Sequence, residues 1–219
     1  MLNQPIMDKL AALKLGGMQE ALREQMESPQ YRKLSFEDRF GLLLDREWDV
    51  RETRKLHRRV RTAKFREQAA VEDVDISAKR GLERRQVLYL AEGTWIREKL
   101  NTIITGATGA GKTYLACALG NAACRTGYAV RFFPLSRLLG KLKLARADGT
   151  YPKLLNKLAK THLLILDDWL RSPLTEAQTA DILEIIEDRY NLRSTLLATQ
   201  VPVSDWHELF GNPTLADAI

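Results

Sequence analysis

The sequence predicts an α/β fold with a parallel sheet, preceded by a small all-α N-terminal module. Three observations support this prediction. From residue 101 onward, short apolar strands alternate with helical stretches, and this order is typical of parallel strands joined by right-handed crossovers. A glycine-rich run at residues 106–113 lies between one such strand and one such helix. The first 70 residues look helical throughout.

The strands of the core are predicted from apolar runs. Before the last of them, Thr175 and Gln178 form a capping-box pattern that predicts the start of a helix. The predicted strands are residues 101–105, 129–133, 162–167 and 194–199.

The N-terminal module is expected to contain a helix over residues 7–25, interrupted at Gly16 and Gly17, and another that begins after Ser35. An apolar stripe opens the second helix. Such stripes are usually core, although a module this short can also present one to a partner. The stripe consists of Phe36, Phe40, Leu43 and Leu44. We place the domain boundary near residue 70, giving a helical module of residues 1–70 and a core of residues 71–219.

The glycine-rich run matches the pattern G-x-x-x-x-G-K-[ST] at every fixed position. Its glycines allow successive N–H groups to point at one anion, and the following helix adds its positive end. Lys112 is expected to meet the outer phosphates and Thr113 to bind Mg²⁺. The alternative is a glycine-rich turn without a ligand. The predicted nucleotide-binding residues are Gly106, Ala107, Thr108, Gly109, Ala110, Gly111, Lys112, Thr113 and Tyr114.

Two carboxylates follow the apolar run at residues 163–166. They lie at the carboxyl end of a buried strand, where open α/β sheets place ligands. We expect Asp167 to hold Mg²⁺ and Asp168 to orient or deprotonate the attacking water. Because Asp168 is shorter than the glutamate usual in related ATPases, slow turnover is expected. In the alternative interpretation, both residues begin a loop and cap the next helix.

Thr199 and Gln200 are polar residues at the end of the last predicted strand. In one interpretation they are catalytic, sensing the γ-phosphate or holding the attacking water. In the other they only hydrogen-bond the end of the strand.

Positive charge is concentrated in two segments. Residues 51–66 contain eight Lys and Arg residues against Glu52 alone, and residues 137–160 contain seven against Asp148 alone, in a chain of net charge +6. Such tracts favour contact with nucleic acid phosphates without base specificity. Solvated helix faces are the alternative. The predicted DNA-binding residues are Arg51, Arg54, Lys55, Arg58, Arg59, Arg61, Lys141, Lys143 and Arg146.

The remaining composition excludes several classes. No apolar run is long enough to span a bilayer, and the amino terminus lacks the regions of a signal peptide, so we expect a cytoplasmic protein. Cys117 and Cys124 lack metal-ligand spacing and are predicted to be buried, reduced packing residues.

The chain resembles the IstB-like transposition helper ATPases, which are AAA+ proteins related to the DnaC helicase loader. The resemblance is carried by the loop with residues 113–120, by residues 163–169 and by residues 197–202. Residues 13–18 and 36–40 of the helical module share it. It covers essentially the whole chain and implies an AAA+ P-loop core.

The resemblance also implies a function. Proteins of this family use ATP and Mg²⁺, assemble as homo-oligomers on target DNA and stimulate the cognate transposase of an insertion sequence. It assigns nucleotide chemistry to residues 106–113, Asp167, Asp168 and the polar strand end.

AAA+ proteins usually complete each site with an arginine that follows the fourth strand in the neighbouring subunit. Residues 216–219 of this chain lie about where the resemblance places an Asp-Arg pair. Arg189 and Arg193 precede the last strand and are poor substitutes. The core is therefore expected to lack the arginine-finger and lid segment.

Two rival functions remain open. A helicase loader would use the helical module to grip a replicative helicase. A small-molecule kinase would need a lid of arginines over two substrates and would not need the basic helix.

Overall fold

The computed structural model describes residues 4–76 and 81–210. The chain forms two compact units, residues 1–58 and 59–219. The division falls inside α3 (Phe36–Ala63), and not near residue 70. The reason is that residues 59–70 pack on the core. Ala63 and Ala69 are buried there, and the Asn121 amide donates a hydrogen bond of 2.8 Å to the Ala69 carbonyl.

The first unit contains α1 (Gln4–Ala12), α2 (Gly16–Glu27), a 3-10 turn η1 (Pro29–Lys33) and most of α3. Glu47 of α3 holds α2 in place, since its carboxylate accepts hydrogen bonds from the backbone N–H groups of Gly17 at 2.7 Å and Met18 at 3.2 Å. Burial alone would raise the pKa of Glu47, but the Arg51 side chain and these two N–H groups lower it below its usual range.

The apolar stripe at the start of α3 is exposed in the first unit. The exposed fractions are 75% for Phe36, 43% for Phe40 and 49% for Leu44, and the two phenylalanine rings stack at 5.9 Å. The expectation that this stripe forms core is therefore wrong for these three residues.

The second unit is built on a four-stranded parallel sheet in the order β1-β4-β3-β2. The strands are β1 (Thr102–Thr105), β2 (Val130–Pro134), β3 (Leu163–Asp167) and β4 (Ser194–Thr199). Asp167 pairs in register with Pro134, and Thr105 with Thr199. The carboxyl ends of all four strands therefore meet at one edge, and the predicted α/β fold is confirmed.

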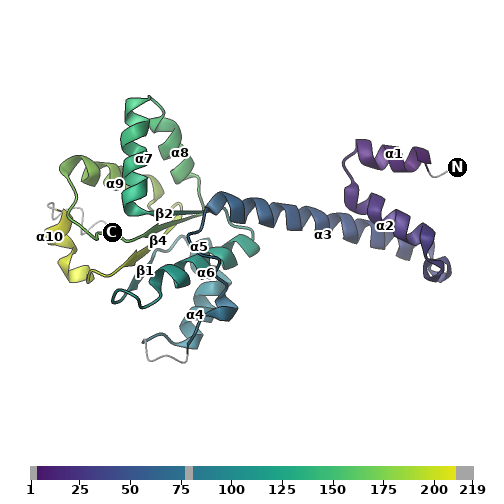
Figure 1. Ribbon diagram of the computed structural model, residues 1–219, viewed down its shortest axis with the longest axis horizontal. Helices are drawn as coiled ribbons and strands as arrows, with labels where there is room; N and C mark the ends of the chain where they lie inside the picture. The colour runs from purple at the N-terminus through teal and green to yellow at the C-terminus, as the bar shows by residue number, and fades with distance from the viewer. Residues whose placement is uncertain (1–3, 77–80, 211–219) are drawn as a thin grey trace. The chain divides into compact units, whose positions relative to one another are not determined.

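Helices cover both faces of this sheet (Figure 1). On one face lie α4 (Arg84–Glu92), α5 (Thr94–Arg97) and α6 (Lys112–Arg125). On the other lie α7 (Leu135–Ala147), α8 (Tyr151–Ala159) and α9 (Glu176–Arg189), with α10 (Trp206–Phe210) near them. Two short 3-10 turns are η2 (Val71–Asp73) and η3 (Val203–Asp205). The predicted capping box at Thr175 begins α9.

The period of two along β3 sends alternate side chains to the two layers. Leu164 and Leu166 belong to the core cluster with α7, α8 and α9, whereas Ile165 meets α6. The approach of α6 requires a glycine, because a Cβ on Gly120 would lie 2.7 Å from Ile165 Cδ1 and 2.5 Å from Phe65 Cε1. This close packing fixes α6, and with it the loop that precedes it.

Cys117 and Cys124 are buried and free on α6, as predicted. Burial raises the pKa of the Cys124 thiol to about 11. Both residues therefore fill space against the sheet and remain protonated at neutral pH.

Candidate functional site

The glycine-rich loop connects the end of β1 to the start of α6, as the motif requires. Gly109 and Gly111 adopt left-handed φ values of 80° and 88°, which side chains with a Cβ rarely tolerate. Gly111 is the N-cap of α6. The loop therefore places its amides at the positive end of a 14-residue helix, which is an arrangement suited to phosphate.

Lys112 lies over this loop. Its ammonium group donates hydrogen bonds of 2.8 Å to the carbonyl oxygens of Gly106 and Ala107. These two contacts hold a positive charge beside the loop amides.

The loop and the acidic strand end meet directly. The Thr113 hydroxyl donates a hydrogen bond of 2.9 Å to Asp167 Oδ2 across 54 positions of sequence. Mg²⁺ is usually held by one or two carboxylates, together with hydroxyl or water oxygens and substrate phosphates. The hydroxyl of Thr113 and the carboxylate of Asp167 are such a donor set, so the residues fit the predicted metal.

Asp167 is almost fully buried, with 2% of its surface exposed. Burial raises its pKa above the usual aspartate range, and the negative charge of Asp168 adds a smaller increase, while the Thr113 hydroxyl, the Asp168 backbone N–H and Arg66 act in the opposite direction. A cation at this position would therefore be attracted by a charge that the fold alone stabilises poorly.

Asp168 departs from the regular strand. Its φ is 53°, in the left-handed region that non-glycine residues seldom adopt. The turn brings its side chain 3.5 Å from Arg66 Nη1, and the same guanidinium lies 3.8 Å from Asp167 Oδ2. The sequence predicted both carboxylates but gave no role to Arg66.

The strand-end residues Thr199 and Gln200 separate into two environments. Thr199 is buried, and its hydroxyl donates to the Trp169 carbonyl at 2.8 Å and accepts from the Val201 N–H at 3.0 Å. Gln200 is exposed, and its side-chain oxygen accepts a hydrogen bond from the Thr108 hydroxyl of the loop. Strand-end hydrogen bonding therefore accounts for Thr199, while Gln200 lies against the loop.

Two cavities flank the loop. One, of about 320 Å³, is lined by loop residues together with Glu67, Asp167, Asp168 and Gln200. The other, of about 520 Å³, is lined by loop residues together with Asp73, Val74, Asp75 and Leu82. Volumes of this order are usual for small-molecule sites.

Trp169 was not predicted as a site residue. It follows the acidic pair and is fully buried, and its indole N–H lacks a hydrogen-bond partner within the described part of the chain. It also lines the smaller cavity. Its position directly after Asp168, within the residues 163–169 that carry the family resemblance, was the available sequence signal.

Comparison with known proteins bears directly on this site. The family profile of IstB-like ATP binding proteins matches residues 8–219. The chain belongs to this family. An insertion sequence ATP-binding protein of Sinorhizobium fredii, y4pL, is 48% identical over all of this chain and 89% of its own length. The ATP-binding protein of insertion sequence IS1162 from Pseudomonas fluorescens is 45% identical over 93% of this chain and 89% of its own length.

Solved structures of other proteins share the fold of the second unit. The DnaC helicase loader superposes with a TM-score of 0.57 at 24% identity, over 73% of this chain and 93% of DnaC. The replication initiator DnaA bound to AMPPCP and single-stranded DNA superposes with a TM-score of 0.60 at 19% identity, over 70% of this chain and 48% of DnaA. These likenesses confirm the predicted AAA+ P-loop fold.

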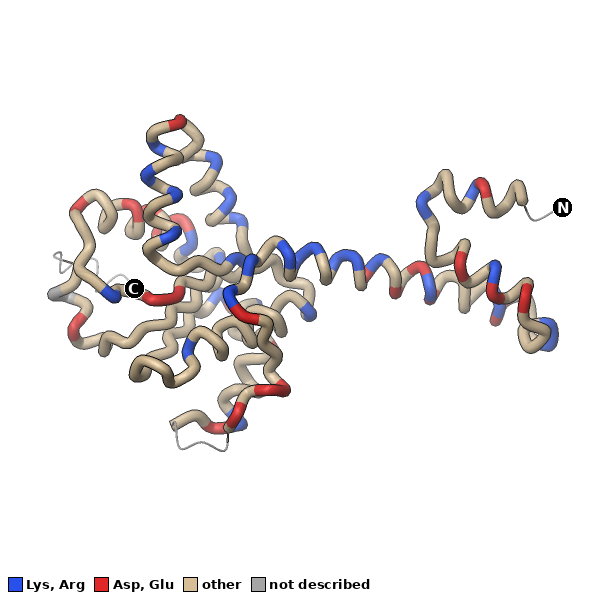
Figure 2. Tube along the Cα trace, viewed as in Figure 1, with Lys and Arg blue, Asp and Glu red and all other residues tan. Residues whose placement is uncertain are grey.

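The predicted DNA-binding residues of this IstB-like protein have several environments. Arg51 pairs with Glu47 and Lys55 with Glu52, each at 2.7 Å. Arg59 donates to the Cys124 carbonyl at 3.5 Å. The others on α3 and α7 are exposed, and basic residues follow one another along α3 (Figure 2). These exposed residues are Arg54, Arg58, Arg61, Lys141 and Lys143.

Arg146 is engaged within the second unit. Its guanidinium lies 2.5 Å from the carboxylate of Asp181 and 3.8 Å from the centroid of the Tyr151 ring. These contacts join α7 to α8 and α9, so they give Arg146 a structural role whether or not it also meets DNA.

Arg189 is a structural residue and not an arginine finger. It is 1% exposed, and it donates hydrogen bonds to the carbonyls of Leu158, Thr161 and Ser194. Burial lowers its pKa to about 10. The segment expected at residues 216–219 lies outside the described residues.

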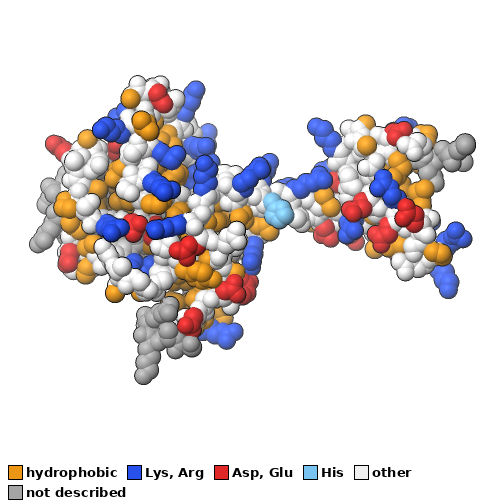
Figure 3. All heavy atoms as spheres, in the orientation of Figure 1, with side chains coloured by type: hydrophobic (Ala, Val, Ile, Leu, Met, Phe, Trp, Pro, Cys, Tyr) orange, Lys and Arg blue, Asp and Glu red, His pale blue; other side chains and the backbone are white. Residues whose placement is uncertain are grey.

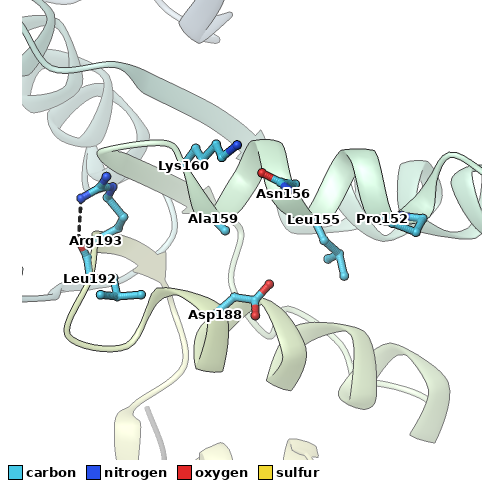
Figure 4. Close-up of a pocket in the computed structure, with 8 residues that line it drawn as sticks. All are labelled: Pro152, Leu155, Asn156, Ala159, Lys160, Asp188, Leu192 and Arg193. Atoms are coloured by element: carbon cyan, nitrogen blue, oxygen red, sulfur yellow. Dashed lines mark hydrogen bonds between the residues drawn. The ribbon is translucent and has the colours of Figure 1, made fainter.

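A third depression, of about 510 Å³, lies between α8, α9 and the turn before β4 (Figure 4). Arg193 there donates a hydrogen bond of 2.9 Å to the adjacent Leu192 carbonyl. The charged side chains that line this depression do not converge on one point in Figure 4. We therefore assign the depression no role. The lining residues are Pro152, Leu155, Asn156, Ala159, Lys160, Asp188, Leu192 and Arg193.

None of the helices within residues 4–76 and 81–210 is long and apolar enough to cross a membrane.

Proposed function

We propose that the protein is a magnesium-dependent ATPase that binds DNA and assists the transposase of an insertion sequence. The observation that carries this proposal is the hydrogen bond between Thr113 and Asp167. It joins the phosphate-binding loop to the acidic strand end, the two features that a nucleoside triphosphatase needs side by side.

Each residue of the site has a definite task in this proposal. The loop amides and Lys112 bind the phosphates, and Thr113 and Asp167 hold Mg²⁺, which when bound neutralises charge that develops on the phosphates. Asp168 accepts the proton of the attacking water, and Gln200 positions that water from the loop side. Asp168 lies directly after β3 with a left-handed φ of 53°, and its carboxylate lies 3.5 Å from Arg66 Nη1.

Two observations support DNA binding: the positive charge of exposed residues and the similarity to insertion sequence proteins. The exposed basic residues of α3 and α7 suit phosphate contacts without base specificity. The relatives at 48% and 45% identity are named for insertion sequences. The resemblance to the IstB-like transposition helpers implies a transposase as the partner and homo-oligomers assembled with ATP and DNA, and we include both, with a cytoplasmic location, in the proposal. The resemblance favours this function over helicase loading, which the fold likeness to DnaC alone would also allow.

The experiment compares ATP hydrolysis and co-sedimentation with duplex DNA for the wild-type protein and Lys112→Ala. We expect slow hydrolysis that DNA stimulates, and ATP-dependent assembly on DNA that Lys112→Ala abolishes. Assembly that is unchanged in Lys112→Ala would contradict the proposal. Phosphoryl transfer to a metabolite, in place of hydrolysis, would indicate a kinase.

A further inference from the structure

A basic groove lies beside the nucleotide site in the second unit. It has a volume of about 1030 Å³ and is formed by the end of α3, the residues that follow it, β2, α7 and α8. Figure 3 shows basic side chains gathered over α7 and α8 on the visible face. Among the described residues that line the groove, Asp168 alone is acidic. The basic residues are Arg61, Lys64, Arg66, Arg131, Arg137, Lys141 and Lys157.

The cations of this groove act on one another. The pKa of Lys157 is lowered by Arg131, by burial, and by Lys64 and Lys141, and burial lowers the pKa of Arg131. Like charges held this close repel unless an anion lies among them. Four elements contribute the cations, so the groove suits an extended anion with several charges, such as a nucleic acid backbone, better than a single small ion.

Arg66 belongs both to this groove and to the nucleotide site. It lines the groove, while its guanidinium lies 3.5 Å from Asp168 and 3.8 Å from Asp167 Oδ2. The same Oδ2 accepts the Thr113 hydrogen bond. Arg66 and a metal ion at Asp167 would therefore compete for this one oxygen atom. The Arg66 side chain is 56% exposed, and ion pairs of such residues are weak enough to exchange partners readily.

We propose that Arg66 couples the two sites: the DNA backbone in the basic groove draws Arg66 away from Asp167 and Asp168 and thereby strengthens magnesium binding at Asp167. This inference rests on the proposed function, which supplies both DNA and Mg²⁺ as ligands. By linkage, magnesium and nucleotide at Asp167 release Arg66 to the groove and strengthen DNA binding by the same factor. Arg66 is thus a positioning residue: a ligand bound at one of the two sites changes the affinity of the other site through the position of its side chain.

The test measures the Mg²⁺ concentration that gives half-maximal binding of a fluorescent ATP analogue, with and without a duplex of random sequence. In the wild-type protein, DNA should lower this concentration roughly two- to fivefold, the range that a partly exposed ion pair provides. In Arg66→Ala the concentration should already be lower without DNA, and DNA should lower it no further. Arg66→Lys keeps the charge and should retain most of the response.

Arg84→Ala is the matched control, because Arg84 is an exposed cation of α4 that does not line the groove. It should behave as the wild type. An unaltered response to DNA in Arg66→Ala, in a protein that binds both ligands, would overturn the coupling alone. If the wild-type protein binds neither the nucleotide with Mg²⁺ nor the duplex, the proposed function is overturned as well.

Discussion

Asp167 shows the conflict between stability and function at the scale of one residue. Burial raises its pKa, so the folded state binds a proton at this carboxylate more tightly than the unfolded state does. Its contribution favours folding at low pH and is lost as the pH rises through the raised pKa. At neutral pH the ionised side chain therefore costs stability, and a bound cation offsets this cost.

Replacing Asp167 with Asn should stabilise the folded protein at pH 7 by about 0.5–1 kcal/mol, since it removes a buried charge and keeps the shape. The gain should vanish at a pH where the wild-type carboxyl is protonated. Thermal unfolding at both pH values measures this. In the same variant, magnesium-dependent nucleotide binding should fall.

Asp148→Asn provides the opposite case. The Thr150 hydroxyl and N–H lower the pKa of Asp148, so its charged form contributes stability at neutral pH that is lost as the pH falls through this lowered pKa. The variant should be less stable than the wild type at pH 7. Loss of stability in Asp167→Asn as well would show that Asp167 is an ordinary structural carboxylate.

Among the elements, α6 decides the geometry of the site, because its first residues are the end of the phosphate-binding loop. Apart from Leu115 and Leu119, the buried residues of α6 are glycine, alanine and cysteine, and these small side chains let the helix approach the sheet closely. Gly120 makes the closest approach, against Ile165 and Phe65. Phe65 follows α3, so this contact also holds the segment that carries Arg66.

Gly120→Ala should destabilise the protein by about 1–3 kcal/mol, because the new methyl group must displace two side chains in a packed layer. Gly140→Ala is the control. Gly140 lies within α7 and a Cβ there would meet nothing within 4 Å, so alanine should stabilise the helix by about 0.5–1 kcal/mol. Denaturant unfolding of both variants gives the comparison, and equal effects would argue against the packing of α6 described above.

The strands and the phosphate-binding loop could be predicted from sequence because their signals are local. The apolar runs gave the strand bounds to within about one residue, and the loop motif needs its glycines in fixed places. Tertiary contacts could not be predicted from the sequence. The charged residues 59–70 resemble a continuation of the helical module, and the burial of Ala63 and Ala69 shows that they belong to the core.

The candidate site divides in the same way. Thr113 and Asp167 were predicted because the glycine-rich loop and the acidic strand end both indicate a site for a nucleotide with Mg²⁺. In the structure a hydrogen bond joins the two residues. A count of charges treats every arginine alike. It could not predict that Arg66 lies beside the acidic pair whereas Arg146 pairs with Asp181.

At the scale of the whole molecule, positive charge is the feature to test. If the basic groove contacts a phosphate backbone, duplex binding should weaken steeply with salt, and Lys141→Ala should reduce the slope of log affinity against log salt by about 1. Arg84→Ala, outside the groove, should leave the slope unchanged. Equal slopes for Lys141→Ala and the wild type would place the DNA elsewhere.

The central claim is that Thr113 and Asp167 hold magnesium and a triphosphate between the loop and β3. The most direct measurement is ATP affinity with Mg²⁺ and with a chelator, for the wild type, Thr113→Val and Thr126→Val. Thr126 follows the other end of α6, where its hydroxyl donates hydrogen bonds to the carbonyls of Ala122 and Ala123 of that helix. We predict roughly tenfold weaker binding for Thr113→Val with Mg²⁺ and little change without it, and wild-type binding for Thr126→Val. Wild-type affinity that chelation leaves unchanged, or Thr113→Val that binds Mg-ATP normally, would contradict the account.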